Sequence, residues 1–172
     1  STLNICKQLV AYFNIPSAPE TLVAIKRKHF KYLFENDTSL QLLDGVLDLI
    51  QNYYNHGLTL VLASSASITN INRIFDSFDL DQYFVAKVSG EDLKESKPHP
   101  EIFIKAAEAA GHPRAQCMVI EDSSNGIKAA NDADIFVVGY DSKHSTDQDY
   151  SNANKVVSSF TEIHYQTVAE LF

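Results

Sequence analysis

The chain has 172 residues and is 45% hydrophobic, which is enough apolar content for the core of one globular domain with a small appendage. Its 14 Lys and Arg residues are outnumbered by 22 Asp and Glu residues. The net charge of −8 excludes a general electrostatic attraction to nucleic acid or to anionic membranes, so an anionic substrate must be captured by a local site.

The two cysteines, Cys6 and Cys117, lie far apart, and neither has a Cys or His neighbour at metal-ligand spacing. The sequence opens without a charged leader followed by an apolar stretch, and no segment approaches the roughly 18 apolar residues of a membrane span. We therefore expect a cytoplasmic protein that does not bind membranes.

The first 40 residues show helical periodicity without a strand pattern. Apolar residues recur at helical spacing between residues 3 and 13. Ser17, Pro19 and Glu20 then combine an N-cap, a proline in the first turn and an acid three residues after the cap, which predicts a second helix ending near Phe34. Residues 1–40 are thus expected to form a helical lobe.

From residue 41 onward, apolar β-rich runs alternate with helical stretches. The runs lie at 58–62, 84–88, 118–120, 135–138 and 155–157, and the helical stretches lie at 68–78, 100–110, 124–131 and 160–171. This alternation is typical of a three-layer, doubly wound (Rossmann-like) α/β fold, in which helices cover both faces of a parallel sheet. Ligands bind such sheets outside the carboxyl ends of the strands, so the residues after each run are the candidates for function.

The first run is followed by a hydroxyl-rich turn that contains Ser64 and Ser65. Hydroxyls and free backbone N–H groups ahead of a helix favour a phosphate, because the helix dipole also attracts negative charge. The alternative is an ordinary serine N-cap in a tight turn.

The second run is followed by Lys97, which lies between Ser96 and the prolines Pro98 and Pro100. The prolines stiffen the loop, so Lys97 projects from a fixed backbone toward the sheet edge and could neutralise a bound anion. The alternative is a surface lysine in a turn, and His99 is interpreted as a loop residue rather than a base.

The third run ends in the acidic pair Glu121 and Asp122, which leads into a helix through a polar turn. Two carboxylates at a strand end suit Mg²⁺, which takes oxygen ligands and usually keeps waters while bridging to a phosphate. The alternative is a helix N-cap formed by Asp122 or Ser123.

Taken together, these three sites resemble motifs of the haloacid dehalogenase superfamily, in its β-phosphoglucomutase-like branch with a helical cap. Ser64 matches the second motif, and Lys97, in its Lys-Pro-x-Pro setting, matches the third. The fourth motif, Glu-Asp-Ser-x-x-Gly, is matched by Glu121, Asp122 and Gly126. The resemblance implies that residues 41–172 form the α/β core and that residues 1–40 form part of the cap.

The family's first motif, an Asp-x-Asp on the strand that opens the core, has no match here. Asp44 and Gly45 imitate its tail, but Leu42 stands at the nucleophile position; the stretch 35–38 offers Glu35 where the family has Asp. We therefore expect that the core lacks its first strand, that the strand's two neighbours are unpaired, and that this chain is part of a longer protein.

The resemblance implies a Mg²⁺-dependent phosphohydrolase that acts on a small phosphorylated metabolite, such as a sugar phosphate, through a phospho-aspartate. Ser64 and Ser65 would hold the phosphoryl group, Lys97 would neutralise it, and Asp122 with Glu121 would bind Mg²⁺, while the nucleophile is absent from this chain. One alternative is a β-phosphoglucomutase-like phosphosugar mutase. Another is a non-catalytic domain that binds a phosphorylated ligand or a partner chain.

Overall fold

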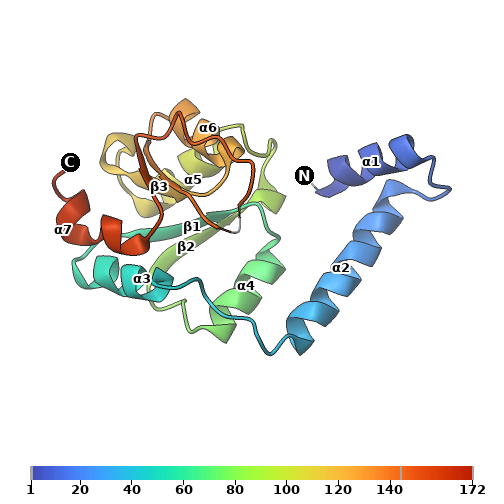
Figure 1. Ribbon diagram of the computed structural model, residues 1–172, viewed down its shortest axis with the longest axis horizontal. Helices are drawn as coiled ribbons and strands as arrows, with labels where there is room; N and C mark the ends of the chain where they lie inside the picture. The colour runs from blue at the N-terminus through green and yellow to red at the C-terminus, as the bar shows by residue number, and fades with distance from the viewer. Residues whose placement is uncertain (1, 144, 172) are drawn as a thin grey trace. The chain divides into compact units, whose positions relative to one another are not determined.

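The computed structural model describes residues 2–143 and 145–171, and its chain divides into two compact units (Figure 1). The smaller unit is Ser1–Leu42 and the larger is Leu43–Phe172. The smaller unit holds the helices α1, Thr2–Phe13, and α2, Pro19–Asn36, which pack against each other. That these helices are part of a cap stays a prediction.

The start of α2 differs from the sequence-based expectation. Its N-cap residue is Ala18 rather than Ser17, and no side chain caps the helix. Pro19 at the start of the helix needs no N–H partner, so the first turn forms without the predicted serine cap. Large apolar side chains of the two helices are exposed, among them Tyr12, Phe13, Tyr32 and Leu33.

The larger unit contains five strands in the described part of the chain, and every pairing between them is parallel. Strand β1, Leu60–Ser64, pairs with β2, Phe84–Ser89. Strand β3, Met118–Glu121, pairs with β4, Phe136–Tyr140, which in turn pairs with β5, Lys155–Val157. The predicted α/β class with parallel strands is confirmed.

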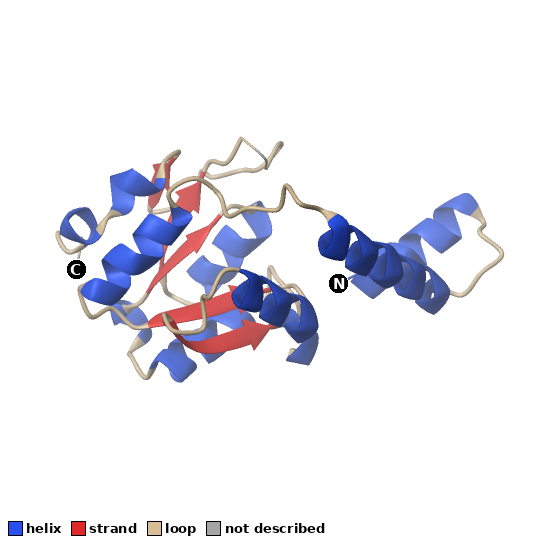
Figure 2. Cartoon of the chain, turned by 90° about the horizontal axis from the view of Figure 1, so that it is seen from below, coloured by secondary structure: helices blue, strands red, loops and turns tan. Residues whose placement is uncertain are grey.

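The prediction of one continuous sheet is wrong, because the strands form two sheets, β1-β2 and β3-β4-β5 (Figure 2). In the described residues, β1 and β3 are each paired on one side only. Every residue of these two strands is partly exposed, whereas Val137, Val138 and Gly139 in the centre of β4 are buried. Within residues 2–143 and 145–171, no strand lies between β1 and β3 to supply the hydrogen bonds that would join the sheets.

Helices cover both faces of the strands. Helices α5, Glu101–Ala110, and α6, Ser124–Asp132, pack on one face. Helix α3, Val46–Asn55, the 3₁₀ helix η3, Phe160–Ile163, and the short helix α7, Tyr165–Val168, pack on the other face. Helix α4, Ile68–Ser77, packs on β2. Two short 3₁₀ helices, η1, Gly90–Asp92, and η2, Arg114–Gln116, lie in the connections.

The last predicted helix, 160–171, is interrupted. Ser159 and Glu162 form a capping box that starts η3, and His164 is extended, with φ −60° and ψ 160°, which separates η3 from α7. The predicted continuous helix is therefore wrong, because the extended backbone of His164 ends the first helical turn.

Helix α5 connects the two sheets through the apolar core. It packs on β1, on β2 and on α6, and its Ile102 and Phe103 are buried. The core on this face contains buried residues of α5, α6 and β4, and Ala63 of β1, Val88 of β2 and Val119 of β3 pack against it. Since no strand pairing joins the sheets in the described residues, this core holds them together.

We expect Ile102→Ala to lower the free energy of unfolding by about 2–5 kcal/mol, because it removes buried methyl groups and leaves a cavity in the core that joins the sheets. Urea unfolding followed by circular dichroism measures the change. Val85→Ala is the control: Val85 is 64% exposed on β2, and its loss should cost about 0.5 kcal/mol or less. Equal effects of the two substitutions would contradict this account of the core.

Candidate active site

An ion pair joins the third and fourth motifs near the carboxyl ends of the strands. Lys97, in the loop that follows β2 and η1, places its Nζ atom 2.8 Å from Oε2 of Glu121, the last residue of β3. Both side chains are only 11% exposed. Lys97 lies in the loop after β2, which belongs to one sheet, and Glu121 ends β3, which belongs to the other. The pair therefore brings the loop after β2 to the carboxyl end of β3.

The Lys97 ammonium also lies over an aromatic ring. Its Nζ atom is 4.6 Å from the centroid of the Phe103 ring, on the first turns of α5. A cation above the face of a ring is attracted by the negative electrostatic potential of the ring. Lys97 is therefore a held, partly buried cation, unlike the surface lysine of the alternative interpretation.

Glu121 is held by residues of its own turn. Oε1 of Glu121 accepts a hydrogen bond of 2.6 Å from the Ser123 hydroxyl, while Oε2 faces Lys97. Gly126 makes room for this carboxylate, because a Cβ atom on residue 126 would lie 2.0 Å from Cδ of Glu121. The glycine of the fourth motif is thus required by the packing of the glutamate.

The serine turn after β1 lies against the end of β2. The Ser64 hydroxyl accepts a hydrogen bond of 3.2 Å from the backbone N–H of Ala66, so it shapes the turn and is not the cap of α4. The buried Ser89 donates its hydroxyl to the carbonyl oxygen of Ala66 at 2.8 Å. At Gly90 a Cβ atom would lie 2.9 Å from Cα of Ser65. Sequence reasoning missed the roles of Ser89 and Gly90.

Ser64 and Ser65 therefore lie at the same strand edge as Lys97, since each motif follows the carboxyl end of its strand. That the serines and the lysine surround one phosphate stays a prediction. The signal for Gly90 was present in the sequence as a glycine two residues after the end of an apolar run, since a glycine near a strand often marks a close approach of two backbones.

Asp122 is exposed, and its contacts come from the loop after β4. Its Oδ2 atom accepts a hydrogen bond of 2.6 Å from the Ser145 hydroxyl, and its backbone carbonyl accepts one of 3.1 Å from the Tyr150 hydroxyl. Burial, and then the negative charges of Asp141 and Asp122, raise the pKa of Tyr150, so the phenol stays protonated and can donate.

The N-terminus of α6 is capped by residues other than Asp122. The Ser123 hydroxyl accepts a hydrogen bond of 3.1 Å from the backbone N–H of Gly126, and Oε1 of Gln148 accepts one of 2.9 Å from the N–H of Ser124. The alternative that Ser123 is an N-cap is confirmed. It does not compete with a metal-binding role for Asp122, whose carboxylate is free of the cap.

The acidic pair fits part of a Mg²⁺ site. Within residues 2–143 and 145–171, no group of three or more His, Cys, Asp and Glu side chains is placed to hold a metal ion. Asp122 and Glu121 can provide carboxylate oxygens, and Mg²⁺ usually fills its remaining positions with water and substrate phosphate. The residues are therefore compatible with a metal that is shared with a substrate.

The two stretches that partly resemble the first motif, around Asp44 and Asp37, do not lie at the end of a strand. Asp44 precedes α3, whose N-cap residue is Gly45 with φ +80°. Asp37 follows α2, and its Oδ1 atom accepts hydrogen bonds from the N–H and the hydroxyl of Ser39, which makes it a loop residue. Hydrogen bonds from Ser39 lower the pKa of Asp37.

Three stretches have the sequence Asp-x-Asp, at 79–81, 132–134 and 147–149. The first two precede β2 and β4, at the amino ends of these strands, and the third lies in the loop after β4. None of the strands in the described residues ends in Asp-x-Asp, so these residues contain no counterpart of the family nucleophile.

Comparisons with known proteins agree with the motifs. A family model described as haloacid dehalogenase-like hydrolase matches residues 8–134. Hexitol phosphatase B from Escherichia coli O157:H7 is 34% identical over 125 residues, which cover 71% of this chain and 55% of that protein. A probable pseudouridine-5'-phosphatase from Drosophila melanogaster is 29% identical over 160 residues, 90% of this chain and 68% of that protein. The chain thus spans just over half the length of hexitol phosphatase B.

Solved structures share the fold. A β-phosphoglucomutase from Clostridium difficile superposes with a TM-score of 0.81 at 25% identity, over 99% of this chain and 76% of that chain. CbbY from Rhodobacter sphaeroides, in complex with xylulose-(1,5)bisphosphate, superposes with a TM-score of 0.77 at 24% identity, over 86% of this chain and 67% of that chain. The second likeness shows the fold alone.

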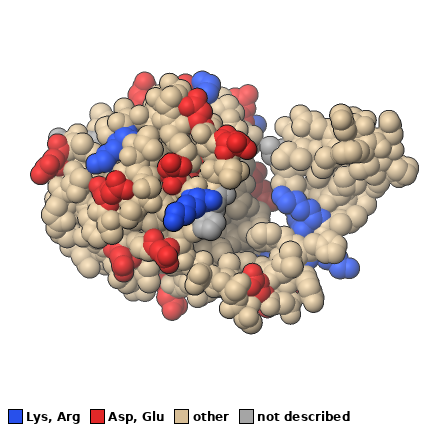
Figure 3. All heavy atoms as spheres, viewed as in Figure 1, with Lys and Arg blue, Asp and Glu red and all other residues tan. Residues whose placement is uncertain are grey.

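The basic residues of the larger unit are scattered on the face that Figure 3 shows. On the face shown in Figure 3, Lys and Arg side chains lie apart from one another over the larger unit and form no continuous basic patch. No helix in the described ranges is long and apolar enough to cross a membrane.

We expect Gly126→Ala to lower the free energy of unfolding by about 1–3 kcal/mol, because the added Cβ would displace the Glu121 carboxylate from Lys97. In a Glu121→Ala background the same substitution should become neutral or stabilising, since Ala favours a helix over Gly by about 1 kcal/mol. Urea unfolding of the four proteins measures this coupling. A loss that is the same in both backgrounds would mean that Gly126 does not make room for Glu121.

Proposed function

The chain belongs to the haloacid dehalogenase-like hydrolase family, and we propose that it carries the phosphate-binding and metal-binding part of a Mg²⁺-dependent phosphohydrolase. The observation that supports this most is the ion pair of Lys97 with Glu121, which places a partly buried cation beside the acidic pair at the carboxyl edge of the strands. The match of these residues to the family's motifs also supports the proposal, and the relatives include proteins named as phosphatases.

In the proposed reaction, each residue acts on charge or position. The Lys97 ammonium neutralises the transferring phosphoryl group, and Ser64 and Ser65 with their backbone N–H groups hold its oxygens. Asp122, with Glu121 beside it, would bind Mg²⁺, which would supply a positive charge that offsets the charge developing on the phosphate. Glu121 also orients Lys97, because its Oε2 atom accepts the hydrogen bond from Nζ.

We propose that the nucleophile is an aspartate on a strand that this chain does not contain and that pairs between β1 and β3. That aspartate would form a phospho-aspartate, which divides one displacement into two easier ones. The partial exposure of every residue of β1 and β3 supports a place for such a strand.

The substrate class we propose is a small phosphorylated metabolite, specifically a sugar phosphate. The names of the relatives support this, because hexitol phosphatase B and the probable pseudouridine-5'-phosphatase are both named for phosphate esters of sugar-containing molecules. The net charge of −8 favours a small ligand over nucleic acid, and on the face shown in Figure 3 the basic residues are scattered. The cytoplasmic location expected from the sequence stays a prediction.

A phosphosugar mutase is the second candidate, and the superposition on a β-phosphoglucomutase over 99% of this chain favours it. A mutase returns the phosphoryl group to the sugar, while a phosphatase transfers it to water. Release of inorganic phosphate from a hexose phosphate, measured beside isomer formation by NMR, distinguishes them. A non-catalytic domain would bind phosphate without either reaction.

The 172-residue chain should show no phosphatase turnover above background with Mg²⁺ and an aryl phosphate. Its residues can position and neutralise a phosphate, but they provide no nucleophile at the strand edge. Release of the aryl alcohol is followed by absorbance. Clear Mg²⁺-dependent turnover would refute the proposed division of roles, and Asp44→Asn and Asp37→Asn would then identify the nucleophile.

In a form of the protein that also carries a strand ending in Asp-x-Asp, Lys97→Ala should reduce kcat by about 100- to 1,000-fold, because one charge-stabilising group is lost. Asp122→Asn should weaken Mg²⁺ binding in calorimetry as well as turnover. The controls are Lys128→Ala and Asp76→Asn, which change exposed side chains on α6 and α4, outside the loop that presents Lys97. Unchanged Mg²⁺ affinity in Asp122→Asn would remove Asp122 from the metal site.

A further inference from the structure

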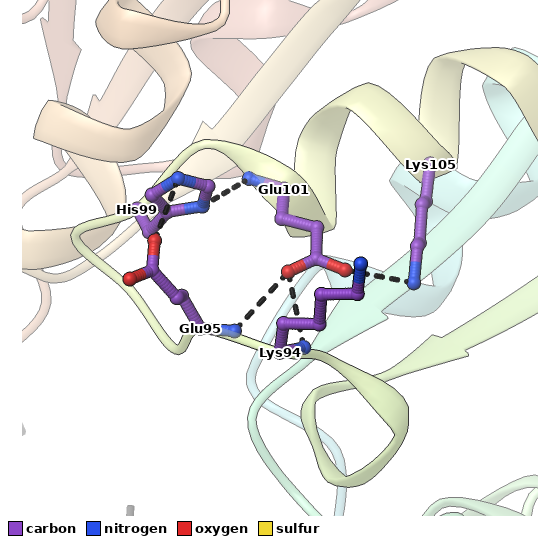
Figure 4. A pocket seen from close by; sticks show the side chains of 5 residues that line it. All are labelled: Lys94, Glu95, His99, Glu101 and Lys105. Atoms are coloured by element: carbon purple, nitrogen blue, oxygen red, sulfur yellow. Dashed lines mark hydrogen bonds and ion pairs between the residues drawn. The ribbon is translucent and has the colours of Figure 1, made fainter.

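The loop that presents Lys97 is held at its start by the carboxylate of Glu101, the first residue of α5 (Figure 4). Oε2 of Glu101 accepts hydrogen bonds from the backbone N–H groups of Lys94 and Glu95, each at 3.1 Å. The Glu101 side chain is only 16% exposed. A carboxylate that accepts two backbone N–H bonds fixes a loop more firmly than neutral contacts do, because charge-assisted hydrogen bonds are stronger.

The Glu101 carboxylate is itself held from the next turn of the helix. Nζ of Lys105 lies 2.9 Å from Oε1 of Glu101. This bond, followed by the one from the backbone of Glu95, lowers the pKa of Glu101, so the carboxyl stays ionised. The two oxygens have separate tasks: Oε1 faces the helix and Oε2 faces the loop.

The end of the loop, at His99, also contacts the first residue of α5. Nδ1 of His99 accepts a hydrogen bond of 3.3 Å from the backbone N–H of Glu101, and Nε2 of His99 lies 2.8 Å from Oε2 of Glu95. Figure 4 shows these side chains facing one another across the loop. Both ends of the segment around Lys97 are therefore connected to residue 101.

The loop needs such a connection because its own backbone offers few donors. Pro98 and Pro100 have no N–H group, and within the loop the backbone N–H of His99 donates to the carbonyl oxygen of Ser96 at 3.1 Å. Helix α5, in contrast, is fixed by the buried residues Ile102 and Phe103, and Phe103 also touches the Lys97 ammonium.

We propose that Glu101 is a positioning residue: by holding the backbone of Lys94 and Glu95 on α5, it keeps the Lys97 ammonium between Glu121 and Phe103. This inference rests on the proposed function for the role of Lys97 toward a phosphate. The placement of Lys97 by Glu101 is a property of the chain itself and can be measured without any activity.

A role in helix stability alone gives a different expectation. An acid in the first turn favours the helix dipole, so Glu101 could stabilise α5 without affecting Lys97. The reactivity of Lys97 distinguishes positioning of Lys97 from stabilisation of α5 alone. An ammonium that is paired and partly buried reacts slowly with an acylating reagent, so only a loss of positioning makes Lys97 react faster than the other lysines. Lys87, 22% exposed and 2.6 Å from Asp81, reports on the rest of the fold in the same molecules.

The experiment measures the acylation rate of each lysine by a water-soluble N-hydroxysuccinimide ester, with peptide mapping by mass spectrometry. In Glu101→Ala, Lys97 should react roughly tenfold faster, which corresponds to about 1.4 kcal/mol of lost protection, while Lys87 should react at its original rate. Lys105→Ala keeps the backbone bonds to Oε2 and should leave Lys97 protected. Glu108→Ala, on the exposed side of the same helix, is the matched control.

An unchanged Lys97 rate in Glu101→Ala would overturn the proposal. If Lys87 and Lys97 both react faster, Glu101→Gln decides, because its amide oxygen can still accept the two N–H bonds: recovery of slow labelling at both lysines supports the proposal, and failure to recover overturns it. None of these outcomes depends on turnover, so they stand apart from the tests of the proposed phosphohydrolase.

Discussion

The ion pair between Lys97 and Glu121 is the constraint that links the fold to the candidate site. It joins a loop that follows one sheet to the last residue of another, with both side chains 11% exposed. Removing two charges from water costs free energy, which close geometry and further hydrogen bonds must offset. Here the Ser123 hydroxyl and the Phe103 ring provide those contacts, and Gly126 leaves the space for them.

Helix α5 makes this arrangement possible because it acts on both sheets. Its buried face, with Ile102 and Phe103, belongs to the core that Ala63 of β1 and Val119 of β3 also contact. Its first residue, Glu101, holds the loop before it. Helix α5 thus fixes the flexible side chain of Lys97 through its buried residue Phe103 and its first residue Glu101. It does so even though the two sheets are not joined by strand pairing in the described residues.

The parallel strands were predictable from the alternation of apolar runs and helical stretches. The positions of Ser64 and Glu121 were predictable because both residues lie at the ends of apolar runs, and Lys97 lies in the loop after the next run. The break between the two sheets agrees with the missing first strand, which the absence of an Asp-x-Asp motif on an opening strand indicated. No local pattern in the sequence encodes which strands are adjacent. The hydrogen bonds from Lys94 and Glu95 to Glu101 could not be predicted, because they depend on how the loop with Pro98 and Pro100 folds back onto the start of α5. The cap at Ala18 instead of Ser17 depends on which of two adjacent residues takes the extended conformation.

The energetic cost of the buried pair also bears on the choice between catalysis and binding. A domain that only captured a phosphorylated ligand could use exposed lysines, which remain hydrated and need no partner. The Lys97 ammonium instead lies against the face of the Phe103 ring and beside Glu121, where it has lost most of its hydrating water. This position depends on Glu101 and Gly126. Such preorganisation is useful where charge develops during a reaction, because the cation then needs no rearrangement at that moment. The geometry around Lys97 therefore favours the phosphohydrolase over a binding domain.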